Sequence, residues 1–201
     1  MKRLRAVLSL VINVLLVIFT IHSVLEGFRM VSLRYFTIES NIYCALSSLC
    51  VAPFALYSVC TGKDRMPKFV SIFKFSGTCA VTITMLTVFL FLGPNGNWRE
   101  LLSGGQLYMH VINPCLALVS LLLLDGGRKI PKSAIAFGVL PVMVYGVVYA
   151  VCVLLCVIWP DFYGFNRGGY WYVSAIVMAL GETAVSVGLR LARNAICGDS
   201  E

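Results

Sequence analysis

Residues 134–159 read AIAFGVLPVMVYGVVYAVCVLLCVIW, an uninterrupted run without a charged side chain. A helix of about 20 apolar residues is long enough to cross the hydrocarbon core of a bilayer. Five other stretches of the chain have the same character, and turns with Gly, Pro or charged residues separate most of them. The predicted spans are residues 6–26, 37–60, 69–92, 105–124, 134–159 and 170–189. We therefore predict an all-α polytopic membrane protein in which residues 1–201 form one bundle of six transmembrane helices.

The composition of the chain indicates the same class of protein. Hydrophobic residues make up 59% of it and charged residues 12%, which is too few polar side chains to cover a water-soluble domain. The net charge of +7 comes from the loops, and no soluble basic surface is predicted that would bind nucleic acid. The eight cysteines lack the spacing of a metal site, so we expect neither a metal ion nor another cofactor.

The Lys and Arg residues predict how the bundle is oriented. Twelve of the 16 fall on the side that carries both termini, and only Arg29, Arg34, Arg99 and Arg167 fall on the other. Because basic loops stay in the cytoplasm, we expect both termini there. Lys2 to Arg5 followed by an apolar run is also typical of a secretory signal peptide. That interpretation is less favoured, because the run is about 20 residues long and no small-residue cleavage site follows it.

The second span begins with the most concentrated polar segment of the chain. Helical spacing places small or polar residues on one stripe, which we expect to face the bundle: Thr37, Ser40, Asn41, Cys44 and Ser48. Polar side chains in hydrocarbon are costly unless they are paired, so each is a candidate functional residue. The alternative is a helix cap, with Thr37 or Ser40 as N-cap and Asn41 bound to backbone groups.

A second polar group lies in the fourth span at the same predicted depth. His110 and Asn113 are three residues apart and share a helix face, and Pro114 is expected to loosen the helix there and free backbone carbonyls. His110 lies about 9 Å below the outer boundary, at about 1.5 Å per residue. The second span enters from the same side, so the sequence predicts a shared pocket between these two groups.

Other ionisable residues are weaker candidates. His22 is near the outer end of the first span, and Glu182 is close to the midplane of the sixth, where a lone carboxylate is expensive. Lys74 is close enough to the cytoplasmic face for its ammonium group to reach water. Asp125 and Asp161 are assigned to loops, and Asp161 follows Trp159 and Pro160 on the outer side, where it can lean over the pocket.

A hydroxyl beside an imidazole can carry out nucleophilic acyl transfer. His110 would take the proton of Thr37, whose oxygen would attack a carbonyl group to form an acyl-enzyme. Asn41 and Asn113 can supply amide donors for the developing oxyanion, and Ser40, Glu39 and Glu182 complete the predicted substrate-binding set. A pocket in the outer half of a bilayer would meet lipid esters directly, so a membrane lipid or lipid ester is the expected partner.

The segment from Arg34 to Asn41, together with Met109-His110 and Pro114, resembles the androgen-induced and androgen-dependent multi-pass membrane proteins. Small bacterial integral membrane proteins share the FT-x-x-SN and H-x-x-x-P patterns. The resemblance implies a six-helix threonine hydrolase of fatty acid esters of hydroxy fatty acids, with Thr37 as nucleophile and His110 as base. It also implies a multi-pass location in a bacterial cytoplasmic membrane.

Two other classes of function stay open from the residues alone. A transporter or binding protein for small molecules or lipids can use Glu182, Lys74 and His110 along a path, although no repeated halves are evident. Haem or quinone binding can use His22 and His110, which lie on the same predicted side.

Overall fold

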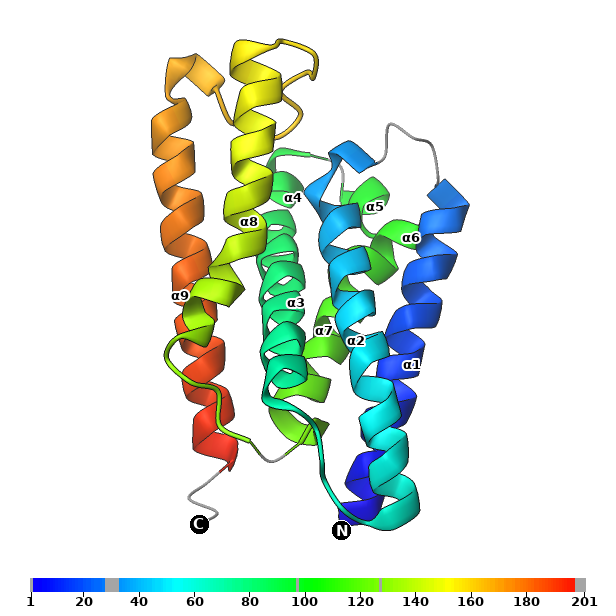
Figure 1. Ribbon diagram of the computed structural model, residues 1–201. Helices are drawn as coiled ribbons and strands as arrows, with labels where there is room; N and C mark the ends of the chain where they lie inside the picture. Colours follow the sequence, from blue (N-terminus) through cyan, green and yellow to red (C-terminus); the bar gives the residue numbers. More distant parts are fainter. Residues whose placement is uncertain (1, 28–32, 97, 127, 198–201) are drawn as a thin grey trace.

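A computed structural model of the protein describes residues 2–27, 33–96, 98–126 and 128–197. These residues form a bundle of helices, and no strand occurs among them (Figure 1). Six of the helices are long and apolar enough to cross a membrane, which confirms the predicted class and the number of spans. The six candidate spans are Arg3–Glu26, Phe36–Thr61, Lys68–Asn95, Gly104–Leu124, Ala134–Leu155 and Trp171–Cys197.

Several spans combine α-helix with wider π-helical turns. The first two are α1 (Lys2–Gly27) and α2 (Phe36–Thr61). The third consists of α3 (Lys68–Thr87), the π turn η2 (Val88–Leu92) and α4 (Gly93–Asn95), and α5 (Trp98–Leu101) follows it. The fourth consists of α6 (Gly104–Leu107), η3 (Tyr108–Ile112), α7 (Asn113–Val119) and η4 (Ser120–Leu124). The last two are α8 (Ala134–Ala150) with η5 (Val151–Leu155), and α9 (Trp171–Cys197), which the 3₁₀ turn η6 (Arg167–Gly169) precedes.

The ends of the last two spans differ from the prediction. The fifth helix stops at Leu155 rather than residue 159, because the backbone turns there and Val157 adopts a positive φ of 51°. The sixth continues to Cys197, well past residue 189. A helix satisfies its backbone hydrogen bonds internally in water as in lipid, so it need not end where the apolar stretch ends.

α3 is the central helix of the bundle. It packs against α2, α7, α8 and α9, with α1 and α2 on one side of it and α8 and α9 on the other (Figure 1). In the most apolar stretch of the third span 61% of the residues are buried, against 11% in the sixth. Small residues on α3 make this close packing possible: a Cβ added to Gly77 would lie 3.0 Å from the Cα of Cys44 and 2.6 Å from Ser47 Oγ.

α1 begins and α9 ends at the same end of the bundle, which we call the lower end (Figure 1). Asp125, assigned to a loop from the sequence, is only 2% exposed there. Its carboxylate accepts hydrogen bonds from Ser9 (2.6 Å), Asn13 (3.0 Å) and Ser120 (2.8 Å). Arg193 donates to the carbonyl oxygen of Asp125. The end of the fourth span is therefore fixed to the first and last helices. Arg29, which the charge argument includes, lies outside the described residues.

We expect Gly77→Ala to destabilise the bundle, because the new methyl group would meet the α2 backbone. Overpacking of this kind costs about 1–3 kcal/mol. Gly188→Ala on α9 is the matched control, because a Cβ there meets nothing within 4 Å. Thermal unfolding of both variants in detergent measures the difference. Equal midpoints for the two variants would contradict the central, tightly packed position of α3.

Candidate functional site

The polar stripe of α2 faces the interior of the bundle, as predicted. Ser40, Asn41, Cys44 and Ser48 are all buried, and Thr37 is partly buried. The capping interpretation of Thr37 and Ser40 is wrong, since α2 begins at Phe36 and its N-cap residue is Tyr35, without a side-chain capping bond. The stripe is therefore available for contacts with other helices.

Asn41 is the residue that joins the two polar groups identified from the sequence. Its Nδ2 donates to the carbonyl oxygens of Thr37 (2.8 Å) and Met109 (3.1 Å), and its Oδ1 accepts from Asn113 Nδ2 at 2.9 Å. Asn113 Nδ2 also donates to Thr20 Oγ1 at 3.2 Å. The first, second and fourth spans therefore meet in one buried network, at the common depth that the sequence predicted.

The turn before Pro114 explains why a carbonyl group is free to bind Asn41. In η3 the Asn113 N–H donates to the Tyr108 carbonyl oxygen, one residue further back than in an α-helix. The Met109 carbonyl oxygen would pair with the N–H of residue 114 in this register, and proline has none. Asn41 supplies the missing donor. The expected loosening of the helix at Pro114 is thus confirmed.

His110 is 3% exposed, and a single hydrogen bond determines its tautomer. Its Nδ1 lies 2.7 Å from the carbonyl oxygen of Leu101 at the end of α5. A carbonyl oxygen only accepts, so Nδ1 carries the proton and the neutral ring keeps its lone pair on Nε2. That form of the ring can accept a proton at Nε2.

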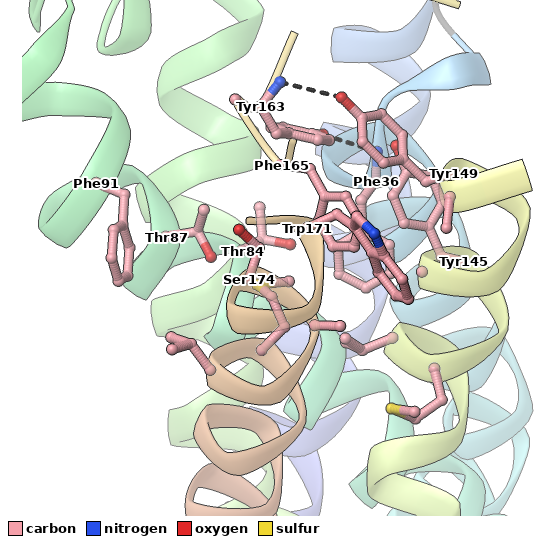
Figure 2. A pocket seen from close by; sticks show the side chains of 18 of the residues that line it. Phe36, Thr84, Thr87, Phe91, Tyr145, Tyr149, Tyr163, Phe165, Trp171 and Ser174 are labelled. Carbon is pink, nitrogen blue, oxygen red and sulfur yellow. Dashed lines mark hydrogen bonds between the residues drawn. The ribbon is translucent and has the colours of Figure 1, made fainter. Parts of the chain in front are cut away.

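Thr37 lines a cavity of about 460 Å³ that lies on the opposite side of α3 from α1, among α2, α3, η2, α8 and α9. Figure 2 shows hydroxyl-bearing Thr84, Thr87 and Ser174 on its wall, among aromatic side chains that include Phe36 and Trp171. Ser40 reaches this wall as well, since its Oγ lies 2.9 Å from Thr84 Oγ1. Most of the remaining lining is apolar, so the cavity suits a hydrocarbon chain with a small polar group.

The cavity is open at the side of the bundle. Phe91, Val147 and Val173 line it, and these side chains are 53%, 62% and 47% exposed. They belong to helices that are long and apolar enough to cross a membrane. Tyr163, Gly164 and Phe165 line the cavity at the end opposite the lower end. The cavity therefore has an apolar opening on the side of the bundle.

Residues 156–170, which we call the cap loop, are organised by Asp161. Its Oδ1 accepts from Tyr149 Oη and from the Phe165 N–H, both at 2.8 Å, and its Oδ2 accepts from the Asn166 N–H at 2.7 Å. Asp161 therefore shapes the loop over the cavity and ties it to α8. The Trp-Pro-Asp segment indicated this position for Asp161 in the sequence, but no pattern pointed to Tyr163 or Trp171.

The cavity and the buried network are adjacent but distinct. His110, Asn41 and Asn113 are not among the residues that line the cavity. Within the described ranges, no hydrogen bond joins the Thr37 hydroxyl to the His110 ring. The structure connects them through Asn41, which binds the carbonyl of Thr37 and the carbonyl of the residue before His110.

Three other candidates lie away from the cavity wall. Glu39 is exposed on α2, and Glu182 is fully buried on α9, where neither carboxylate oxygen has a hydrogen-bond partner among the described residues. The expectation that Lys74 reaches water is wrong. Its side chain is fully buried between α3 and α2, and its Nζ donates to Ser48 Oγ at 2.7 Å.

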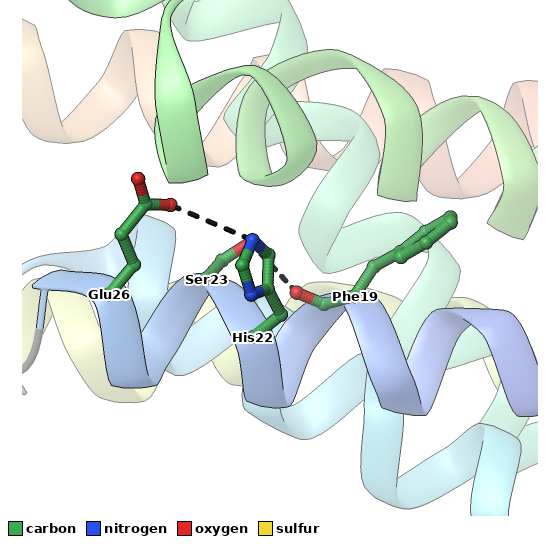
Figure 3. Close-up of polar contacts among 4 residues, drawn as sticks. All are labelled: Phe19, His22, Ser23 and Glu26. Atoms are coloured by element: carbon green, nitrogen blue, oxygen red, sulfur yellow. Dashed lines mark hydrogen bonds and ion pairs between the residues drawn. The ribbon is translucent and has the colours of Figure 1, made fainter.

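His22 lies in an environment quite unlike that of His110. Its side chain is 60% exposed, and its Nε2 lies 3.9 Å from Glu26 one turn further along α1 (Figure 3). The edge of its ring also packs on Tyr108, with the ring centroids 5.8 Å apart. An exposed i,i+4 pair of this kind contributes little to stability. The carboxylate that lies near His22 therefore belongs to its own helix and not to the buried network.

Comparisons of the chain with protein-family models, with curated proteins and with solved structures find no match.

Asn41→Ala is expected to lower the thermal midpoint, because it leaves the Met109 carbonyl without its donor and removes one of the two acceptors of the Asn113 amide. A buried unpaired polar group costs about 1–3 kcal/mol. Asn95→Ala is the control, since Asn95 is exposed and its Nδ2 donates only to Phe91 O in its own turn. If both substitutions had the same small effect in detergent-solubilised protein, the network would not be stabilising the bundle.

Proposed function

We propose that the protein hydrolyses acyl esters of lipids inside the bilayer, with Thr37 as nucleophile and His110 as general base. One observation carries the proposal: Thr37, at the start of α2, lines an apolar cavity that is open to the side of a membrane-spanning bundle. The proposed substrates are fatty acid esters of hydroxy fatty acids or similar lipids. Their acyl chain would occupy the apolar part of the cavity, with the ester group near the hydroxyl-bearing residues.

The proposed reaction proceeds in two steps. Thr37 Oγ1 bonds to the ester carbonyl carbon while its proton passes to Nε2 of His110, and the carbonyl π electrons move onto oxygen. The tetrahedral species collapses, the C–O bond to the alcohol breaks, and the leaving oxygen takes the proton from His110. Water then attacks the acyl-threonine by the same route, which releases the carboxylic acid and restores the Thr37 hydroxyl.

Two features support His110 in this role. The Leu101 carbonyl holds the proton on Nδ1, so that Nε2 is the basic atom. Asn41 fixes the backbone next to His110 against the turn of α2 that carries Thr37. The proposal requires a close approach of Nε2 to Thr37 Oγ1 when an ester occupies the cavity, as catalytic hydrogen bonds often tighten only with substrate bound.

We also propose that the protein lies in a bacterial cytoplasmic membrane with its lower end in the cytoplasm. The excess of Lys and Arg on the side of both termini supports this orientation. The cavity and the cap loop would then belong to the outer half of the bilayer. Lipids of the outer leaflet would be the accessible substrates.

Thr37→Ala and His110→Gln are each expected to abolish hydrolysis of a palmitoyl ester of hydroxystearic acid, whereas Thr37→Ser retains part of it. Gln keeps a donor for the Leu101 carbonyl but cannot act as a base. Thr183→Ala, on the exposed face of α9, is the control and keeps wild-type activity. Fluorophosphonate labelling with mass spectrometry should locate the modified residue at position 37. Hydrolysis that survives both Thr37→Ala and His110→Gln would disprove the mechanism.

Gly146→Leu is expected to reduce hydrolysis of long-chain esters more than that of short-chain esters. Gly146 lines the cavity, and a Cβ added there meets nothing within 4 Å, so a larger side chain fills the space without a clash. Gly188→Leu, which has equally open surroundings outside the cavity lining, is the matched control. The ratio of kcat/KM for palmitoyl and butyryl esters measures the effect. An unchanged ratio would mean that the acyl chain binds elsewhere.

A further inference from the structure

The phenol of Tyr163 lies at the beginning of α2, beside the proposed nucleophile. Its Oη accepts a hydrogen bond from the Phe36 N–H at 3.0 Å (Figure 2). Tyr163 and Thr37 both line the cavity. A residue of the cap loop, 126 positions further along the chain, thus binds the backbone next to Thr37 and lines the same cavity.

The surroundings of the phenol make it a good hydrogen-bond donor. The first N–H groups of a helix have no partner within it, and the positive end of the helix dipole lies there. When the Phe36 N–H donates to Oη, it polarises the Tyr163 O–H and strengthens it as a donor. Burial raises the pKa of Tyr163 to about 12, although the hydrogen bond from the Phe36 N–H opposes the rise. The phenol therefore keeps its proton at physiological pH.

We propose that Tyr163 is a further catalytic residue, whose O–H donates a hydrogen bond to the ester carbonyl oxygen as Thr37 attacks. This inference rests on the proposed hydrolase function. As the C–O bond from Thr37 forms, negative charge builds on the carbonyl oxygen, and the Tyr163 O–H stabilises it without giving up its proton. The charge returns to the C=O bond when the alcohol leaves, so Tyr163 ends each step in its starting form.

A purely structural role would be to hold the cap loop on α2. The loop has other attachments that do not involve the phenol oxygen. Asp161 binds Tyr149 and two backbone N–H groups of the loop, and the Tyr163 N–H donates to Tyr149 Oη at 3.2 Å. Removal of the phenol oxygen alone leaves all of these bonds in place. Substitution of Tyr163 by Phe therefore separates the chemistry of the hydroxyl from the position of the loop.

The test compares wild-type protein with Tyr163→Phe, and uses Tyr172→Phe as the control outside the cavity lining. The substrates are p-nitrophenyl butyrate and a palmitoyl ester of hydroxystearic acid, and a fluorophosphonate probe reports on Thr37. Loss of one oxyanion donor predicts a fall in kcat of roughly 10²-fold or more for Tyr163→Phe, with KM nearly unchanged. Labelling of Thr37 should slow in parallel, and Tyr172→Phe should match the wild type.

The outcomes distinguish this inference from the proposed function. If wild-type protein neither hydrolyses the esters nor reacts at Thr37, both fail. If the wild type is active and Tyr163→Phe retains its kcat and labelling rate, only the role of Tyr163 fails. Should Tyr163→Phe not fold, replacement of Tyr163 by 3-fluorotyrosine keeps the hydroxyl and makes it more acidic. An unchanged kcat in that protein would equally overturn the inference.

Discussion

Hydrocarbon offers no hydrogen bonds, so each polar group within the bundle must find its partner in the protein. This constraint is most visible at Asn41, whose amide satisfies a carbonyl of its own helix and a carbonyl released by the π turn before Pro114. Asn113 completes the arrangement by donating to both Asn41 and Thr20. The helices that carry the proposed nucleophile and base are thereby fixed to each other by polar contacts that water cannot replace.

The same constraint accounts for the central position of α3. Its small and hydroxyl-bearing residues allow four helices to approach closely. The Lys74 side chain stays buried because its ammonium group donates a hydrogen bond to Ser48 Oγ. At the lower end, the Asp125 carboxylate accepts hydrogen bonds from three side chains, and Arg193 donates to the backbone carbonyl oxygen of Asp125. The apolar cavity lies among α2, α3, η2, α8 and α9, and its opening is on the side of the bundle.

The separation of a buried polar network from an apolar cavity suits the proposed enzyme that acts on lipids. The buried network joins the backbone at Thr37 to the backbone beside His110, whereas the cavity next to it is open and mostly apolar. The cap loop closes the far end and brings the Tyr163 phenol to the start of α2. Thr37 therefore contacts the buried polar network through its carbonyl oxygen and also lines the cavity proposed for a hydrocarbon chain.

The sequence alone determined the six spans, the inward polar stripe of α2 and the common depth of Asn41 and Asn113. These features follow from periodicity and from the cost of polar groups in lipid, which are local properties of a helix. It misjudged Lys74, because burial depends on which helices surround a residue. The role of Asp161, the place of Tyr163 and the cavity itself were decided by tertiary structure alone. They arise where the cap loop meets α2 and α8, and no spacing along the chain encodes a contact between residues 36 and 163.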